Sequence, residues 1–142
     1  SDPLITDAED RLRAGLQCVA AFRVEAWVDF EDLYSIVYEM VLNKQGGVLR
    51  DMSIECLRRV SLVHNHALFT RGSGMMRNVV NYHERTYVKV MNLQPLLNVA
   101  RTLYERPVAR RWRIETAFGE MPPQLALALG IIQCSLLYFC WG

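Results

Sequence analysis

Apolar and polar positions along the chain follow a helical period almost from end to end. Apolar residues recur three and four positions apart, and no stretch sustains the alternation typical of a half-buried strand. This pattern predicts an all-α fold, an antiparallel helical bundle with short connections. Five helices are expected, over about 7–22, 29–45, 48–66, 75–91 and 95–105.

Capping and helix-breaking residues set the expected boundaries. Thr6 or Asp7 is placed to cap the first helix and Asp29 the second, because these side chains accept hydrogen bonds from free N–H groups. The segment Gln45-Gly46-Gly47 is expected to end the second helix. Three further interruptions are expected at the stretch TRGSG (residues 70–74), at Pro107 and at the pair Pro122-Pro123.

The second predicted helix has more apolar surface than one core contact requires. Its expected core face, a stripe about 100° wide, consists of Leu33, Ile36, Val37 and Met40. Five more residues widen the apolar arc to about 240°, namely Phe30, Tyr34, Tyr38, Val41 and Leu42. The expected core positions of the first and third helices are Leu12, Leu16, Val19 and Ala20, and Leu49, Met52, Leu57 and Val60.

Three aromatic residues of this arc, Phe30, Tyr34 and Tyr38, stand four positions apart and form what we call the aromatic ridge. Two interpretations of the ridge are open on the pattern alone. In the first, the helix is buried on two sides within a larger bundle. In the second, the ridge is a partner surface, because tyrosine and phenylalanine bury large areas with few rotors to immobilise.

The fourth predicted helix has an apolar and a polar face. The apolar face is expected to contain Met76, Val79, Val80, His83, Tyr87 and Val90, with His83 as a hydrogen-bonded core histidine. Tyr82 and Arg85 point the other way, together with Asn78 and Asn81. A tyrosine–arginine pair has the chemistry of a binding hot spot, and the alternative is a solvated pair on a helix surface.

Composition and charge narrow the class of protein. Of the 142 residues, 51% are hydrophobic and 22% are charged, as is typical of one globular domain. The net charge of +1 argues against a general nucleic-acid binder. Residues 1–60 contain eleven acidic and seven basic residues, whereas residues 61–142 contain four and nine, which suits either differently charged partners or two solvated faces.

Cysteine usage and the C-terminal segment bear on location. The four cysteines are Cys18, Cys56, Cys134 and Cys140. They form no C-x-x-C motif and no signal-peptide pattern precedes them, so we expect reduced thiols in a cytoplasmic or nuclear protein.

Residues 125–141 are almost wholly apolar and near the lower length limit for a membrane span. A buried closing helix is the preferred interpretation, and a membrane anchor is the alternative.

Four segments carry a family resemblance. The stretches are RLRAGLQ (11–17), FEDLYSIVYEMVLNKQGGVL (30–49), YHERTYV (82–88) and LLNVARTLYERPVAR (96–110). The second, with its Phe-Glu-x-Leu-Tyr-x-x-x-Tyr pattern and Lys-x-Gly ending, resembles the adaptor-binding second helix of the cullins, the scaffolds of multisubunit ubiquitin ligases. The third resembles the Tyr-x-x-Arg-x-Tyr-Val segment of the fifth helix of the first cullin repeat. The resemblance covers roughly residues 9–111 and is greatest to cullin three, which binds BTB-domain adaptors.

The resemblance implies a non-catalytic interaction domain that docks a ubiquitin-ligase adaptor, with the BTB class favoured. The positions that match cullin partner-binding residues are Phe30, Glu31, Leu33, Tyr34 and Tyr38, followed by Tyr82 and Arg85. The aromatic ridge is then a docking surface and not a second core face.

The chain also departs from the cullin pattern. The region between the two contact motifs is shorter by about twenty residues, the length of a helix, so TRGSG is expected to mark a helix that has shrunk or gone. We expect a cullin-repeat-like domain over residues 1–111 and an unmatched apolar helix, packed on it, over residues 112–142. Later cullin repeats have no counterpart, which leaves a scaffold fragment, a cullin mimic or a decoy that sequesters adaptors. An oligomeric or membrane-tethered helical protein is the alternative of another class.

No catalytic residue, cofactor or metal site is predicted. The chain has no phosphate-binding loop and no nucleophile elbow. His64 and His66 lie two apart on an expected helix, so they do not share a face as metal ligands would. One basic run either binds an anion, with Tyr104 and Trp112 near it, or forms a solvated face at a helix end. Its members are Arg101, Arg106, Arg110, Arg111 and Arg113.

Overall fold

The structure, a computed structural model, describes residues 3–23 and 25–117, and every regular element in these ranges is a helix. The predicted all-α class is therefore confirmed for this part of the chain. The elements are α1 (Pro3–Ala20), α2 (Phe30–Leu42), α3 (Gly46–Ser61), α4 (His66–Val79), α5 (Asn81–His83), the π-helix η1 (Glu84–Val88), α6 (Leu96–Glu105) and α7 (Pro107–Ala117).

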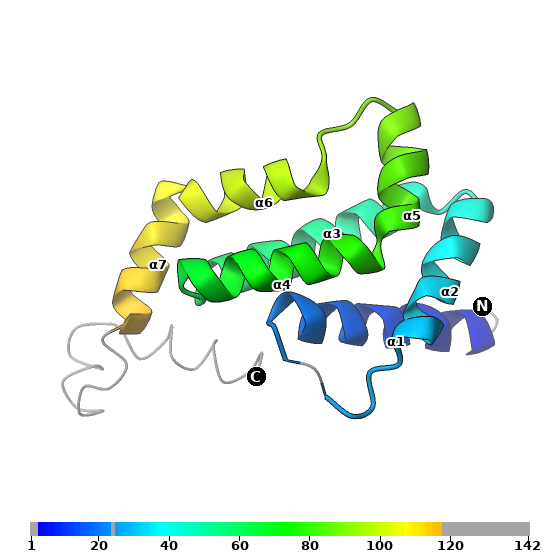
Figure 1. The fold of residues 1–142 in the computed structure, drawn as a ribbon, viewed down its shortest axis with the longest axis horizontal. Helices are drawn as coiled ribbons and strands as arrows, with labels where there is room; N and C mark the ends of the chain where they lie inside the picture. Colours follow the sequence, from blue (N-terminus) through cyan, green and yellow to red (C-terminus); the bar gives the residue numbers. More distant parts are fainter. Residues whose placement is uncertain (1–2, 24, 118–142) are drawn as a thin grey trace.

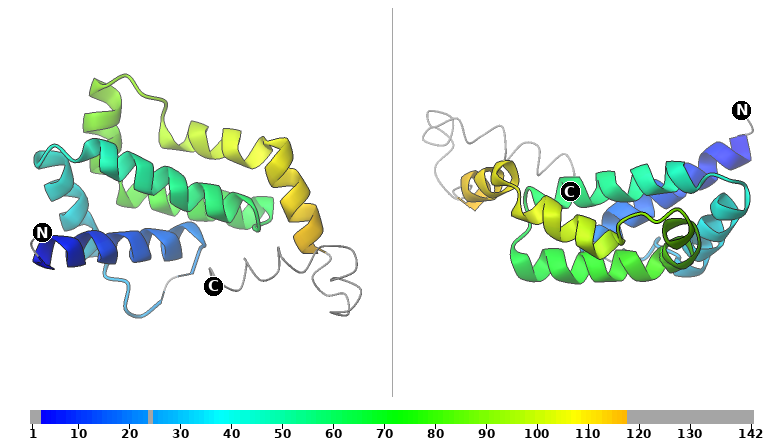
Figure 2. Two further views of the ribbon diagram at one scale, coloured as in Figure 1. Left: turned by 180° about the vertical axis from the view of Figure 1, so that it is seen from behind. Right: turned by 90° about the horizontal axis from the view of Figure 1, so that it is seen from above.

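The helices are arranged around a central pair, α3 and α4, which run side by side (Figures 1 and 2). α1 packs against this pair on one side and α6 on the other (Figure 1). α2 meets α5 at one end of the pair, and α7 follows α6 at the opposite end. Segments far apart in the sequence therefore meet at the α2–α5 end.

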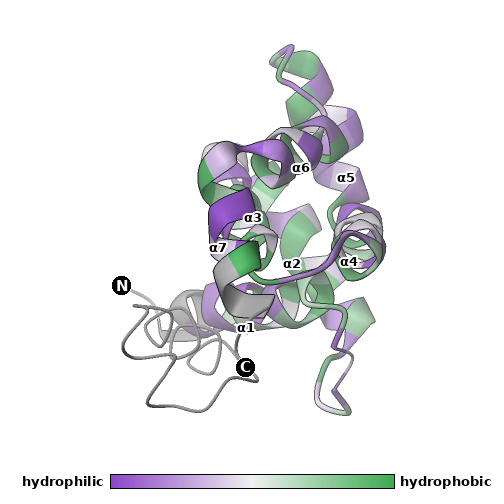
Figure 3. Ribbon diagram, turned by 90° about the vertical axis from the view of Figure 1, so that its left-hand side faces the viewer, coloured by the Kyte–Doolittle hydropathy of each residue, from purple (hydrophilic) through white to green (hydrophobic). Residues whose placement is uncertain are grey.

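One hydrophobic core joins α1, α2, α3, α4 and α6. Each helix shows both hydrophilic and hydrophobic residues (Figure 3), as expected where one side faces the core. The predicted core positions of the first three helices are all buried, namely Leu12, Leu16, Val19, Ala20, Leu33, Ile36, Val37, Met40, Leu49, Met52, Leu57 and Val60. The helical period was sufficient to find them.

Asp29 caps α2 as predicted. Its Oδ1 accepts hydrogen bonds from the backbone N–H groups of Glu31 (3.0 Å) and Asp32 (3.3 Å). We expect Asp29→Ala to lower the free energy of unfolding by about 1 kcal/mol, measured by urea denaturation. Asp51→Ala, at an exposed position within α3, is the control and should change it by less than about 0.5 kcal/mol. Equal losses in both variants would contradict the capping role.

The other predicted boundaries are less accurate. α1 begins at Pro3, so the expected caps Thr6 and Asp7 lie within the helix. α2 ends in a Schellman motif in which Lys44 takes the left-handed conformation (φ 61°) and Gln45 N–H donates to the Met40 carbonyl at 2.8 Å. The glycine that follows does not end α2.

Gly46 instead begins α3, where a Cβ atom would overlap the ring of Tyr87. Glycine is required at this position because the Tyr87 ring from η1 packs directly on the backbone of α3. α2 therefore ends close to the predicted segment, but the glycine pair does not terminate it, and Gly46 is required for packing.

The predicted break at residues 70–74 is also wrong, because this stretch lies inside α4, a helix of 14 residues. Gly72 is buried, and a Cβ atom there would overlap the carbonyl oxygen of Ala20. The glycine permits α4 to approach the end of α1. The segment expected to mark a shrunken helix is therefore a helix–helix contact.

The π-helix changes which side of the following segment is buried. His83 is 1% exposed, as predicted, but the next buried residue is Val88, five positions later, while Val90 is 80% exposed. In a continuous α-helix, Tyr87 and Val90 would lie on the same buried face as His83. The i→i+5 hydrogen bonding of a π-helix instead shifts the buried position by one residue. Tyr87 is half-buried. The predicted placement of Val90 on the apolar face is wrong for this reason.

Pro107 separates α6 from α7, as expected, and opens α7. The expected domain boundary at residues 111 and 112 falls within α7. The remainder of the expected C-terminal helix, with Cys134, Cys140 and Pro122-Pro123, lies outside the described residues. Within the ranges that the structure describes, no helix has the length and apolar character needed to cross a membrane.

Candidate functional site

Four of the seven predicted partner-binding residues line one surface cavity between α2 and the α5–η1 segment. These four are Tyr34, Tyr38, Tyr82 and Arg85. The cavity has a volume of about 440 Å³, and we call it the tyrosine groove. Its other lining residues are Ser35 of α2, Asn78 and Val79 of α4, and Asn81 of α5.

Direct contacts join the two walls of the tyrosine groove. The ring centroids of Tyr38 and Tyr82 are 4.8 Å apart with the planes tilted by 51°. The guanidinium carbon of Arg85 lies 5.5 Å from the centroid of the Tyr82 ring, within the range of a cation–π contact. The structure therefore places side by side two segments that are more than forty positions apart in the sequence.

Exposure along the aromatic ridge argues against a helix buried on two sides, as far as the described residues go. Tyr34 and Tyr38 are each 47% exposed, and Leu42, one turn beyond them, is 55% exposed. Phe30 is half-buried against the core, with its ring centroid 6.5 Å from that of Tyr34. Glu31 is exposed in the first turn of α2. The ridge thus has a half-buried first residue and an exposed remainder.

Leu33 does not belong to this surface. Its side chain is 3% exposed and lies against Gly15 of α1. A Cβ atom added to Gly15 would lie only 2.7 Å from Leu33 Cδ2. The predicted core position is confirmed, and the placement of Leu33 among partner-contacting residues is corrected. Its contribution to the site is to hold α2 on α1.

An ion-pair network also fixes the start of α2. Arg11 of α1 donates from Nε to Asp32 Oδ2 at 2.9 Å and from Nη1 to Asp7 Oδ2 at 2.5 Å. The hydrogen bond from Arg11 lowers the pKa of the Asp32 carboxyl below its ordinary value, and the two carboxylates raise the pKa of Arg11. These groups are largely exposed, so the network orients the helix more than it stabilises the fold.

The opposite wall is held by its own polar contacts. His83 donates from Nε2 to the Gly46 carbonyl at 2.9 Å and stacks on Tyr87 at a centroid distance of 5.3 Å. The Glu84 carboxylate accepts a hydrogen bond from Leu96 N–H at 3.1 Å, which caps α6 in place of Pro95. Tyr82 and Arg85, which flank His83 and Glu84, are therefore carried by a segment anchored to both α3 and α6.

Two buried histidines give the fold a predicted pH dependence. His64 and His83 each hydrogen-bond a backbone carbonyl, and burial lowers the pKa of both imidazoles below the ordinary value of 6.5. The unfolded chain therefore takes up protons near pH 6.5 that the folded chain does not. Above that pH both histidines contribute their full stabilisation. Below it the free energy of unfolding falls by up to about 1.4 kcal/mol per pH unit for each histidine.

Urea denaturation between about pH 7.5 and pH 5 would measure this slope. His64→Gln should reduce it, because one buried imidazole is removed. An unchanged slope in His64→Gln would contradict the assignment.

The described side chains form neither a metal cluster nor an activated thiol. Within residues 3–23 and 25–117 no group of three or more histidine, cysteine or acidic side chains could hold a metal ion. Cys18 and Cys56 are free thiols whose pKa values are raised by burial, to about 12 for Cys56, which is the opposite of an activated nucleophile.

Residue periodicity had placed Tyr82 and Arg85 on a polar helix face with Asn78 and Asn81, and the structure brings all four to the tyrosine groove. Ser35 was missed, because a serine on an exposed helix position gives no pattern signal. No protein-family model, curated protein or solved structure matches this chain.

Proposed function

We propose that the tyrosine groove and the exposed part of the aromatic ridge form a docking surface for a ubiquitin-ligase adaptor, with the BTB class favoured. The proposal rests on the observation that one cavity is lined by Tyr34 and Tyr38 of α2 together with Tyr82 and Arg85 of the α5–η1 segment. These are the residues that resemble the two adaptor-contacting segments of the first cullin repeat, and they derive from separate parts of the sequence.

The chemistry of the surface supports the same proposal. Half-exposed tyrosines offer large apolar area with a hydroxyl that tolerates water or a partner, and arginine is enriched with tyrosine at binding hot spots. The walls are anchored through Leu33 and His83, so few groups must be ordered when a partner binds. A rigid aromatic surface of this kind favours recognition of a folded protein.

Calorimetric titration of the chain against purified adaptors would test the proposal. The panel contains BTB domains, a Skp-type adaptor and an elongin pair, so the result also names the adaptor class. Binding to one class, weakened in Tyr34→Ala with its helix content intact, would support docking through the groove. Absence of binding to all three classes would refute the proposal.

Two alternatives are separated by companion measurements. A decoy binds the same adaptor but inhibits substrate ubiquitination when added to a complete ligase, whereas a scaffold fragment joined to its missing ligase arm supports it. An oligomeric structural protein instead shows a concentration-dependent mass in sedimentation, and Tyr38→Ala would lower that mass if the ridge pairs with itself.

A further inference from the structure

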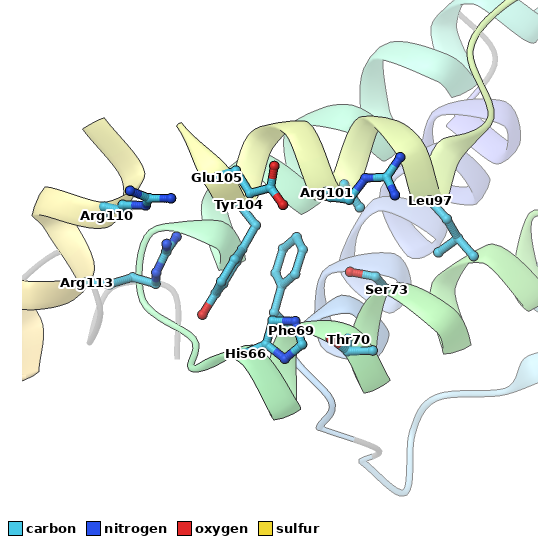
Figure 4. A pocket seen from close by; sticks show the side chains of 11 residues that line it. His66, Phe69, Thr70, Ser73, Leu97, Arg101, Tyr104, Glu105, Arg110 and Arg113 are labelled. Carbon is cyan, nitrogen blue, oxygen red and sulfur yellow. The ribbon is translucent and has the colours of Figure 1, made fainter. Parts of the chain in front are cut away.

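A second cavity lies between α4, α6 and α7, away from the tyrosine groove (Figure 4). Its volume is about 460 Å³. Phe69 and Tyr104 form an aromatic wall, with ring centroids 4.6 Å apart, and Leu97 and Ala100 add aliphatic surface from α6. The size and the apolar walls suit one small planar ligand.

Ser73 contributes an unpaired polar group to this cavity. Its side chain is 3% exposed, its hydroxyl has no hydrogen-bond partner among the described residues, and it points towards the ring of Phe69 (Figure 4). Two other helical hydroxyl groups donate to the carbonyl four residues earlier, Ser53 to Leu49 at 2.9 Å and Thr102 to Asn98 at 3.0 Å. A buried unpaired hydroxyl is unfavourable unless something occupies the site.

Positive charge gathers at the same cavity. Arg101, Arg110 and Arg113 line it, against one carboxylate, that of Glu105. Arg113 is already engaged, stacked 3.6 Å from the Tyr104 ring centroid and donating to the Ser61 carbonyl at 2.7 Å. Arg101 and Arg110 are exposed, and their guanidinium groups form no hydrogen bond or ion pair with a described residue. Burial and repulsion from Arg110 lower the pKa of Arg113.

We propose that this cavity binds a small aromatic carboxylate. The ring lies against Phe69 and Tyr104, and the carboxylate faces Ser73 and the guanidinium group of Arg101, which lie on the same side of Phe69 (Figure 4). The hydroxyl of Ser73 and the guanidinium group of Arg101 donate to the carboxylate oxygens, which satisfies the buried hydroxyl and adds a negative charge to a cavity lined by three arginines and one glutamate. This site shares no residue with the tyrosine groove, so it is independent of the function proposed above.

Calorimetry of the full 142-residue chain with 2-naphthoate would test the site. The neutral 2-naphthylmethanol, which has the same ring system, is the ligand control and should bind about tenfold more weakly. Arg101→Gln should weaken naphthoate binding by about tenfold, whereas Arg111→Gln, at an exposed position outside the cavity, should leave it unchanged.

Ser73→Ala separates a ligand-binding role from a structural one. It should weaken naphthoate binding by about tenfold without lowering the melting temperature, because the hydroxyl makes no hydrogen bond within the described fold. The proposal is overturned if 2-naphthoate does not bind the full chain, if both ligands bind equally, or if Ser73→Ala and Arg101→Gln bind as the unmodified chain does.

Discussion

Replacing Gly72 with alanine is expected to lower the free energy of unfolding by about 2 kcal/mol or more, although alanine is the better helix former. The added methyl group would overlap the carbonyl oxygen of Ala20 and would lie 2.8 Å from the carbonyl carbon of the same residue. The obstacle is main chain and has no rotamer into which it can move. Relief requires α1 and α4 to separate, which weakens the packing of the core positions at the end of α1.

Gly74, two residues later in α4, is the matched control. A Cβ atom there has no atom within 4 Å, so Gly74→Ala should raise the free energy of unfolding by about 0.5–1 kcal/mol through helix propensity alone. The two variants are expected to differ by about 3 kcal/mol in urea denaturation. Similar stabilities would show that the α1–α4 contact is looser than described.

Truncation of Tyr38 is expected to weaken adaptor binding by about thirtyfold or more, equivalent to about 2 kcal/mol. Tyr38 is the point at which the two walls of the tyrosine groove touch, through its contact with Tyr82. Tyr38→Ala therefore removes its own contact area and also the support of the Tyr82 ring. Tyr38→Phe retains the ring and should retain most of the affinity.

Calorimetry with the adaptor that binds in the panel would measure these affinities, with circular dichroism to confirm helix content. Val90→Ala, at an 80% exposed position outside the groove, is the control and should bind normally. A double-mutant cycle of Tyr38→Ala with Arg85→Ala should be non-additive, because both residues act through Tyr82. A folded Tyr38→Ala variant with unchanged affinity would exclude the groove as the docking surface.

Short-range patterns were sufficient for much of the fold. The core stripe of α2 and its cap Asp29 follow from residue spacing and from one side chain that accepts nearby N–H groups. His83 was predicted as a satisfied core histidine and is one, bound to the Gly46 carbonyl. In each case the determining interactions lie within one helix, or the helical period alone identifies the buried side.

The errors concern residues whose role depends on a distant partner. Gly72 was predicted to break a helix because glycine has low helix propensity, whereas its absent side chain serves the contact with Ala20. Val90 was placed with the core because an α-helical period was assumed across η1. Leu33 was included among the partner-contacting residues by its match to the cullin pattern, and packing against α1 removes it from the surface.

The sequence by itself determined the helical class of the described residues, their principal core positions and the surplus of aromatic surface on α2, since these depend on the spacing of side chains along one helix. Only the tertiary structure decided that Tyr38 meets Tyr82, that Gly46 and Gly72 serve close packing, and that Ser73 is left unpaired at a cavity that three arginines also line. Those outcomes depend on how closely separate helices approach and on the one-residue shift of a π-helix, which no periodicity within a single segment encodes.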